Sequence, residues 1–164
     1  GEARSLYIIA SALIGLAVIL WITDIKSKKE RRLNEFTWIH ALWIGIAQTF
    51  ALIPGASRAG TTLTMGLMLG FTREASMRFS FLLSIPAIGL SGVYELIKER
   101  EHLADAGFGG LFVGTTVSAL VGYAAIWGLL KYLRTHSTLV FVLYRIVIGV
   151  FILILLYLKI LKAL

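Results

Sequence analysis

Residues 54–63 read Pro-Gly-Ala-Ser-Arg-Ala-Gly-Thr-Thr-Leu, and they interrupt a long apolar region of the chain. The stretch places one permanently charged guanidinium, that of Arg58, among glycines and hydroxyl side chains. An ionisable group inside a membrane is costly, so it is a site hypothesis by default. Glycines let backbone amides approach a ligand closely, and the N-terminus of a following helix favours an anion such as phosphate. The stretch therefore predicts an anion-binding turn within a membrane helix.

The composition indicates that the solvent of most of the chain is a bilayer. Of the 164 residues, 58% are hydrophobic and 15% are charged, whereas soluble domains carry about 25% charged residues. There is no cysteine, which excludes disulfides and thiolate metal sites. The net charge of +7 is typical of cytoplasmic loops and headgroup contacts in a membrane protein. Because no basic stripe with interleaved aromatics lies outside the apolar runs, nucleic acid is not an expected partner.

The apolar runs predict an all-α, polytopic membrane helix bundle that forms a single membrane domain over residues 1–164. Four runs approach or exceed the roughly 20 residues that a spanning helix needs. They are residues 5–23, 74–98, 111–133 and 139–158. The apolar pieces on either side of the turn are shorter, and the second, residues 61–71, covers only about 16 Å of a hydrocarbon core of about 30 Å. We therefore predict a re-entrant helix hairpin over about 37–71, which is tolerated where protein or water satisfies its backbone.

Arg58 and Ser57 are the residues of the turn whose side chains are best suited to bind or react with a phosphate. The planar guanidinium of Arg58 binds two phosphate oxygens at once and stays charged in a poor dielectric. The alternative is that Arg58 snorkels to the interface and anchors a loop. The hydroxyl of Ser57 attacks phosphorus, donates a hydrogen bond to a phosphate oxygen, or caps the helix that follows, which is its commonest use. The residues alone leave these alternatives open.

Four other polar residues are candidates for contacts with a ligand. Thr61 and Thr62 lie in the first helical turn, where free amides gather, and their hydroxyls either contact phosphate or bond back to the helix. Gln48 either faces the same cavity as Arg58 or makes an interhelical hydrogen bond. Arg145 lies deep in the last apolar run, so we predict that it faces the bundle interior and pairs with a carboxylate or an anion.

The carboxylates lie nearly all in expected loops or at helix ends, and no pair of them falls in an apolar run. Divalent cations such as Mg²⁺ and Ca²⁺ need several oxygen ligands, most often carboxylates. His40 lies near the start of the first half-helix and is typical of a membrane interface rather than of a catalytic base. The sequence therefore predicts no metal site made by this chain alone.

Residues 48–62, together with the segment from Arg78 to Pro86, resemble the second signature of the bacterial undecaprenyl-diphosphate phosphatases, also known as bacitracin-resistance proteins. The family pattern is P-G-x-S-R-S-G-x-T, followed by a helix rich in phenylalanine and serine that ends in proline. The resemblance extends in segment order from residue 5 to 158. It implies removal of the terminal phosphate from undecaprenyl diphosphate, a polyprenyl diphosphate lipid, which recycles the carrier for cell-wall synthesis in the bacterial inner (plasma) membrane.

The resemblance also assigns roles to residues at matching positions of this sequence. Residues 57, 58 and 62 match the phosphate-handling positions of the family, and residues 55 and 60 match its turn glycines. Ala59 departs from the second serine of the pattern, which removes one hydroxyl. The predicted catalytic residues are Ser57, Arg58 and Thr62. The predicted substrate-binding residues are Gly55, Gly60, Thr61, Gln48 and Arg145.

A second family signature has no counterpart near the start of the chain. It is glutamate-rich, of the form E-x-x-E with a following S-S-T-G-H, and residues 1–23 do not match it. The family is built from two inverted repeats, which place a site at the repeat interface, and this chain resembles the C-terminal repeat region. The resemblance implies a divalent cation, Mg²⁺ or Ca²⁺, held by carboxylates outside this chain. We expect Gly1 to be a cut end, and the N-terminal half of the same enzyme or a second copy to complete the site.

Two other functions compete with hydrolysis. Broken helices that aim their N-termini at an anion also occur in secondary transporters, so a transporter or flippase of a phosphate-bearing lipid is the alternative. A purely structural bundle is the third hypothesis, since Gly66 and Gly70 have the spacing of close helix packing in lipid. Arg58 and Arg145 argue against it, because each is expensive without a partner.

Overall fold

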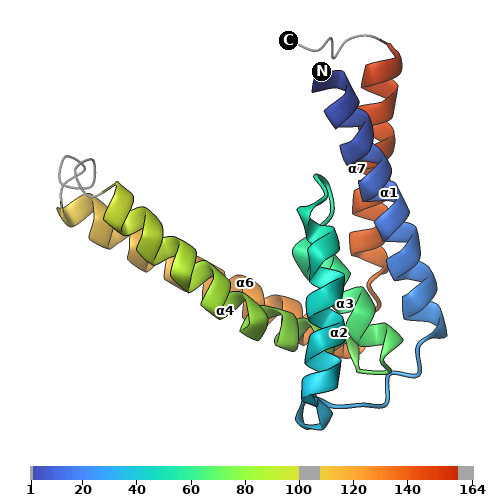
Figure 1. Cartoon of the computed structure of the whole chain (residues 1–164), viewed down its shortest axis with the longest axis horizontal. Helices are drawn as coiled ribbons and strands as arrows, with labels where there is room; N and C mark the ends of the chain where they lie inside the picture. Colours follow the sequence, from blue (N-terminus) through green and yellow to red (C-terminus); the bar gives the residue numbers. More distant parts are fainter. Residues whose placement is uncertain (1, 100–107, 159–164) are drawn as a thin grey trace.

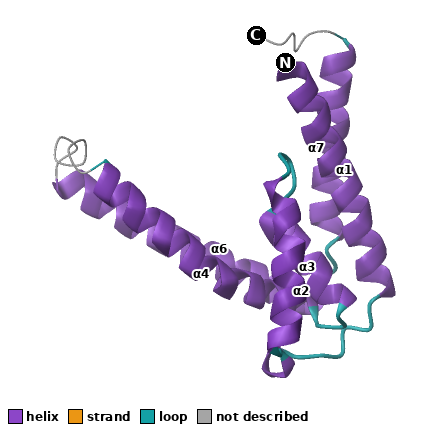
Figure 2. Ribbon diagram, viewed as in Figure 1, coloured by secondary structure: helices purple, strands orange, loops and turns teal. Residues whose placement is uncertain are grey.

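The computed structural model describes residues 2–99 and 108–158, and every regular element within them is a helix (Figure 2). The chain start at Gly1 therefore lies outside the described residues. Four helices are long and apolar enough to cross a membrane, over Leu6–Lys26, Arg73–Lys98, Gly109–Thr135 and Leu139–Tyr157. The prediction of an all-α bundle with four helices of spanning length is confirmed.

Helices α1 (Glu2–Lys26) and α7 (Leu139–Tyr157) pack side by side and run in opposite directions (Figure 1). The two helix backbones approach closely because small residues lie at their interface. A Cβ added to Gly149 of α7 would lie 2.6 Å from the Cγ1 of Ile14 and 3.2 Å from the carbonyl oxygen of Ala10. Small residues let helix backbones approach closely in lipid, where packing takes the place of the hydrophobic effect between helices.

Residues 37–71 form two short helices joined by a turn rather than one continuous rod. Helix α2 (Trp38–Thr49) continues into the 3-10 helix η2 (Phe50–Leu52), and α3 (Arg58–Met68) returns beside α2. Within this α2–α3 hairpin, α3 is the helix that packs against α1 (Figure 1). With 11 residues, α3 is about 16 Å long. The predicted break is therefore present, while a re-entrant placement of the hairpin in a bilayer stays a prediction.

The end of α3 is set by Gly70, and its packing by Gly66. Gly70 has a φ of +86°, which a glycine adopts at no steric cost at a helix C-terminus. A Cβ added to Gly66 would lie 2.5 Å from the Oγ of Ser76, so the absence of a side chain lets α3 contact the next helix. Of the predicted packing pair, Gly66 serves close helix packing and Gly70 serves the turn.

Helices α4 (Arg73–Lys98) and α6 (Phe108–Thr135) form a hairpin that extends away from the other helices (Figure 1). Thr72 caps α4 by accepting a hydrogen bond from the amide of Ala75 at 3.2 Å. Only the base of the hairpin is buried, at residues such as Ser76, Ser80 and Leu133. From Ile85 to Lys98 in α4, every residue is exposed.

The base of the hairpin is tied to α1 and α7 by the buried carboxylate of Asp24, which is 4% exposed. Asp24 accepts hydrogen bonds from the Nε of Arg73 at 2.7 Å and from the amide and hydroxyl of Thr138 at 3.0 and 2.8 Å. The Nζ of Lys29 lies 3.6 Å from it. One side chain therefore joins the end of α1, the start of α4 and the start of α7.

Candidate functional site

The turn between η2 and α3 is pressed against the backbone of α1. Gly55 has a φ of +89°, and a Cβ added there would lie 2.6 Å from the carbonyl oxygen of Ile9 and 2.9 Å from its Cα. The turn is closed by the amide of Ala56, which donates to the carbonyl of Ile53 at 2.9 Å. Only glycine fits position 55 without moving the turn or α1.

Ser57 is the N-cap of α3. Its backbone is extended, with φ −77° and ψ 124°, and its Oγ accepts a hydrogen bond from the amide of Gly60 at 3.1 Å. A serine hydroxyl has one donor and two acceptor sites. The cap uses one acceptor site, so the O–H of Ser57 stays available to an acceptor outside the helix.

Arg145 reaches this turn from α7, and the residue is only 8% exposed. Its Nη2 donates to the carbonyl oxygen of Gly55 at 3.0 Å. A Cβ added to Gly60 would lie 2.7 Å from the Nη1 of Arg145, so the second turn glycine makes room for the guanidinium. Among the described residues, no carboxylate pairs with Arg145. Its charge is therefore open to an anion.

Ser57 and Arg145 both line a pocket of about 350 Å³ at the turn. Gly55, Gly60 and Tyr144 also line it. The other lining residues are apolar and come from α1, α3, α4, α6 and α7: Leu13, Leu20, Ala59, Leu63, Met77, Leu129 and Phe141. Arg145 is the one charged residue in this lining. A single guanidinium in an apolar pocket suits an amphiphile with an anionic end.

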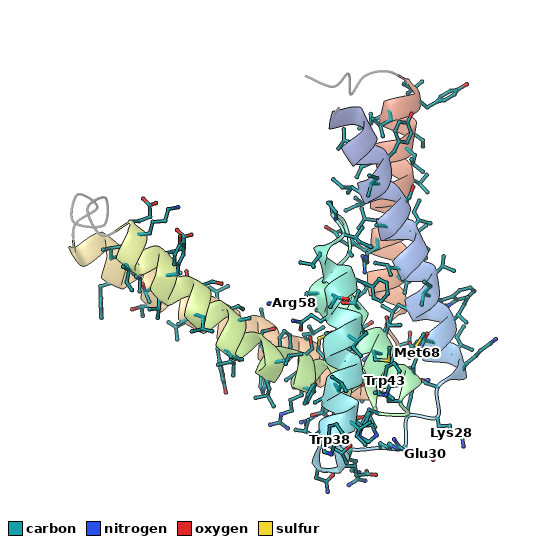
Figure 3. The ribbon with its side chains drawn as sticks, in the orientation of Figure 1. Lys28, Glu30, Trp38, Trp43, Arg58 and Met68 are labelled. Atoms are coloured by element: carbon teal, nitrogen blue, oxygen red, sulfur yellow. The ribbon has the colours of Figure 1, made fainter. Side chains whose placement is uncertain are left out.

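Arg58 is placed differently from Arg145. It is the first residue of α3, is half-buried, and is not among the residues that line this pocket. Figure 3 shows its side chain extending from α3 away from α1 and α7, toward the side on which α4 and α6 depart. Within residues 2–99 and 108–158, its guanidinium makes no ion pair with a carboxylate. The site thus brings Ser57 together with Arg145, while Arg58 leaves the same turn in another direction.

The hydroxyls of Thr61 and Thr62 bond back to the helix. Both donate to the carbonyl of Arg58 at 2.9 Å. Thr62 is fully buried, and its Oγ1 lies 2.6 Å from the Oγ of Ser80 in α4. The sequence left two alternatives for these threonines, a contact with phosphate or a hydrogen bond to their own helix. In the structure, both hydroxyls make the hydrogen bond to the helix. A direct contact with phosphate by either residue remains a prediction.

Gln48 and His40 lie on α2, outside this pocket. Gln48 is half-buried near the end of the helix. His40, at the other end of α2, has its Nδ1 3.0 Å from the hydroxyl of Thr37 and its Nε2 3.0 Å from Arg31. The place of His40 therefore gives it no part in the chemistry of the turn.

Two residues that contribute to the site were not among the predicted site residues. Tyr144 lines the pocket beside Arg145, and Ser80 holds the hydroxyl of Thr62. The signal for Ser80 was present, because Ser76, Ser80 and Ser84 recur every four residues and so share one helix face. No local pattern distinguishes Tyr144 from the other aromatics of an apolar run.

Carboxylates and histidines do not gather at the turn. No group of three or more His, Cys, Asp or Glu that could hold a metal ion occurs among the described residues. The lining of the pocket offers a guanidinium and hydroxyls but no carboxylate. This set of donors does not fit Mg²⁺ or Ca²⁺, which prefer carboxylate and carbonyl oxygens.

Residues 2–151 match the family described as bacitracin resistance protein BacA. The chain belongs to this family. Among its BacA-family relatives, the undecaprenyl-diphosphatase of Chlorobium chlorochromatii is 48% identical over 159 residues, which cover 92% of this chain and 56% of the relative. The protein of the same name from Myxococcus xanthus is 50% identical over 155 residues, which cover 94% of this chain and 52% of the relative.

The undecaprenyl-diphosphatase of Chloroherpeton thalassium is likewise 50% identical over 159 residues, covering 92% of this chain and 56% of the relative. The chain thus spans about half the length of the curated BacA-family relatives that it matches. The resemblance to this family is confirmed. With four membrane-capable helices and this family membership, the chain is part of a multi-pass membrane protein.

Proposed function

We propose that this chain supplies the phosphate-binding part of a membrane-embedded hydrolase that converts undecaprenyl diphosphate to undecaprenyl phosphate and inorganic phosphate. The observation that carries the proposal is the meeting of Ser57 and Arg145 in one otherwise apolar pocket. The apolar walls suit a prenyl chain, and the guanidinium suits a diphosphate. The names of the BacA-family relatives support the same reaction, and none of the three relatives described above is named as a transporter.

In this proposal, Arg145 binds a phosphate oxygen and stabilises the charge that develops on the transferred phosphoryl group. Arg58 leaves the turn on another side from this pocket, so we assign it to the part of the diphosphate that extends beyond the pocket. Ser57 has one of two roles. Its hydroxyl attacks the terminal phosphorus, and water then hydrolyses the resulting phosphoserine, or it orients the phosphate for direct attack by water. In both routes, the bond between the terminal phosphorus and the bridging oxygen breaks, and that oxygen leaves on undecaprenyl phosphate.

Thr62 acts as a positioning residue in this proposal. Its hydroxyl spans from the first turn of α3 to Ser80 of α4, so it fixes the turn against a second helix. Gly55 and Gly60 shape the turn for Arg145, and Thr61 holds the same helical turn by its back-bond. Gln48, on α2, is assigned a contact with the substrate where its prenyl chain joins the phosphate.

A divalent cation, Mg²⁺ or Ca²⁺, belongs to the proposal, but its carboxylate ligands are assigned to the part of the protein that this chain does not span. The N-terminal half of the same enzyme, or a second copy, would supply them. The half-length match to the relatives supports this arrangement. The bacterial inner membrane is the proposed location.

The test uses the full-length polypeptide that contains this chain, in detergent, with undecaprenyl diphosphate and Mg²⁺ or Ca²⁺. We expect Arg145→Lys to reduce phosphate release about 10- to 100-fold, because a point charge does not reproduce the guanidinium fork. The control is Arg31→Lys, at an exposed position away from the pocket, which should retain activity. Equal activity in both variants, or no phosphate release by the unmodified protein, would refute the proposal.

Two serine variants separate the routes. Loss of activity in Ser57→Ala with partial recovery in Ser57→Cys supports attack by the side chain. Near-normal activity in Ser57→Ala would exclude both attack and orientation by the hydroxyl, and would limit Ser57 to capping α3. The chain on its own should release phosphate far more slowly than the full-length protein, because it lacks the proposed cation ligands.

A further inference from the structure

A second pocket, of about 520 Å³, lies at the end of α3 opposite the turn. We call it the basic pocket. Its walls come from the loop after α1, from the start of α4 and from the end of α6. Five of the residues that line it are cationic and one is acidic: Lys29, Arg32, Arg73, Arg78, Arg134 and Glu74. It has no residue in common with the pocket that contains Ser57 and Arg145.

The acidic residues of this region do not neutralise the basic pocket. Arg134 pairs with Glu74 at 2.7 Å. Arg73 and Lys29 share the carboxylate of Asp24 at 2.7 and 3.6 Å. Within the part of the chain that the structure describes, no carboxylate pairs with Arg32 or Arg78. Two guanidiniums therefore line a polar cavity whose charge an anion would balance.

An apolar groove along the α4–α6 hairpin adjoins the basic pocket at Arg78, which lines both cavities. The groove has a volume of about 500 Å³. Its other lining residues are Phe81, Leu82, Ser84, Ile85, Ile88, Ile126 and Leu130. A charged cavity next to an apolar groove matches a molecule with an anionic head and a hydrocarbon tail. Free phosphate would use only the first part.

We propose that the basic pocket and its groove bind an anionic phospholipid. The phosphate of the headgroup lies between Arg32 and Arg78, and an acyl chain lies in the groove between α4 and α6. The location supports this assignment, because the pocket lies at the ends of helices of spanning length and basic pockets between such helices recognise anionic headgroups. The site is separate from the turn and does not depend on the proposed hydrolysis.

The test measures lipid binding to the delipidated full-length protein by native mass spectrometry. Phosphatidylglycerol is compared with phosphatidylethanolamine of the same acyl chains. The double variant Arg32→Gln/Arg78→Gln should weaken phosphatidylglycerol binding about tenfold or more. It should weaken phosphatidylethanolamine binding much less, because the ammonium of that lipid already balances its phosphate. The matched control Lys26→Gln/Lys28→Gln removes the same charge from exposed positions outside the pocket and should bind like the unmodified protein.

Further arms keep the proposal falsifiable. If the double variant does not fold, Arg32→Gln alone, in an exposed loop position, should still weaken binding severalfold relative to Lys28→Gln. Dihexanoyl phosphatidylglycerol should bind more weakly than the long-chain lipid because it leaves the groove empty. Equal loss in both double variants, equal binding of the two headgroups, or displacement of the lipid by millimolar inorganic phosphate would each overturn the proposal.

Discussion

Two pairs of helices, each long and apolar enough to cross a membrane, behave in opposite ways in this molecule. Helices α1 and α7 pack along their length, with Gly149 against Ile14 and Ala10. Helices α4 and α6 contact each other but expose nearly all of their outer halves (Figure 1). Lipid tails are as apolar as leucine, so exposure is not costly for such helices in a bilayer. Hydropathy therefore indicates that a segment enters a membrane, but it does not indicate whether the segment packs against another helix. Small residues alone do not decide this either, because glycines of α4 and α6 such as Gly92 and Gly122 have open space around them.

The three matched pairs of variants below test this contrast, each with one residue in the packed part and one on the hairpin. All are measured in the full-length protein. A large effect at a hairpin position would mean that the remainder of the protein covers it.

The largest effect is expected at Gly55. Gly55→Ala forces a side chain into a residue with φ +89° and against the backbone of Ile9, which should lower the free energy of unfolding by about 2–4 kcal/mol. Displacement of the turn should reduce phosphate release by about 100-fold or more. Gly114→Ala, on α6 with open space around it, should change stability by less than about 0.5 kcal/mol. Comparable losses in the two variants would contradict the contrast.

The next effect concerns two carboxylates at the base of the α4–α6 hairpin, those of Asp24 and Glu74, which both form ion pairs. Asp24→Asn removes the charge that Arg73 and Lys29 share and one acceptor of Thr138. We expect a loss of about 2–3 kcal/mol in thermal or denaturant unfolding, because the carboxylate is buried. Glu74→Gln breaks the pair with Arg134, whose side chain is 60% exposed, and should have little effect on unfolding. A larger loss for Glu74→Gln would show that the exposed pair holds the hairpin.

The smallest effect is expected for two threonines. Thr62→Val removes the hydroxyl contact with Ser80 and should destabilise the protein by about 1 kcal/mol. The same variant should lower kcat more than it raises KM if Thr62 positions the turn. Thr116→Val removes an exposed hydroxyl that, within the described residues, donates to the carbonyl of Phe112 in its own helix, so its effect should stay within about 0.5 kcal/mol. An unchanged kcat for Thr62→Val would limit Thr62 to a structural role.

The elements of this fold could be predicted because they depend on local physics. The length of each apolar run set the four spanning helices, and Pro54 and Gly55 marked the break between α2 and α3. The direction of the α4–α6 hairpin could not be predicted, since an apolar face has the same sequence pattern whether it meets this chain, another chain or lipid. The family match was also within reach, because residues 48–62 hold a long motif.

The sequence predicted individual residues of the site, such as Ser57 and Arg145, but not which of them lie together in space. Sequence reasoning ranked Arg58 first because its guanidinium is permanently charged, binds two phosphate oxygens at once and interrupts an apolar region. The structure instead brings Arg145 into the pocket with Ser57, through a hydrogen bond to Gly55 across 90 positions. A contact at such separation leaves no local signal, whereas the depth of Arg145 in an apolar run did indicate that it needs a partner.

The link between Arg145 and Gly55 also has a consequence for biosynthesis. Domains and segments emerge from the ribosome in chain order, N-terminal parts first. The turn at 54–57 therefore leaves the ribosome long before α7 does. The carbonyl of Gly55 accepts its hydrogen bond from Arg145 only after α7 has been synthesised. Newly made protein should acquire a formed pocket only after α7 has entered the membrane and packed beside α1.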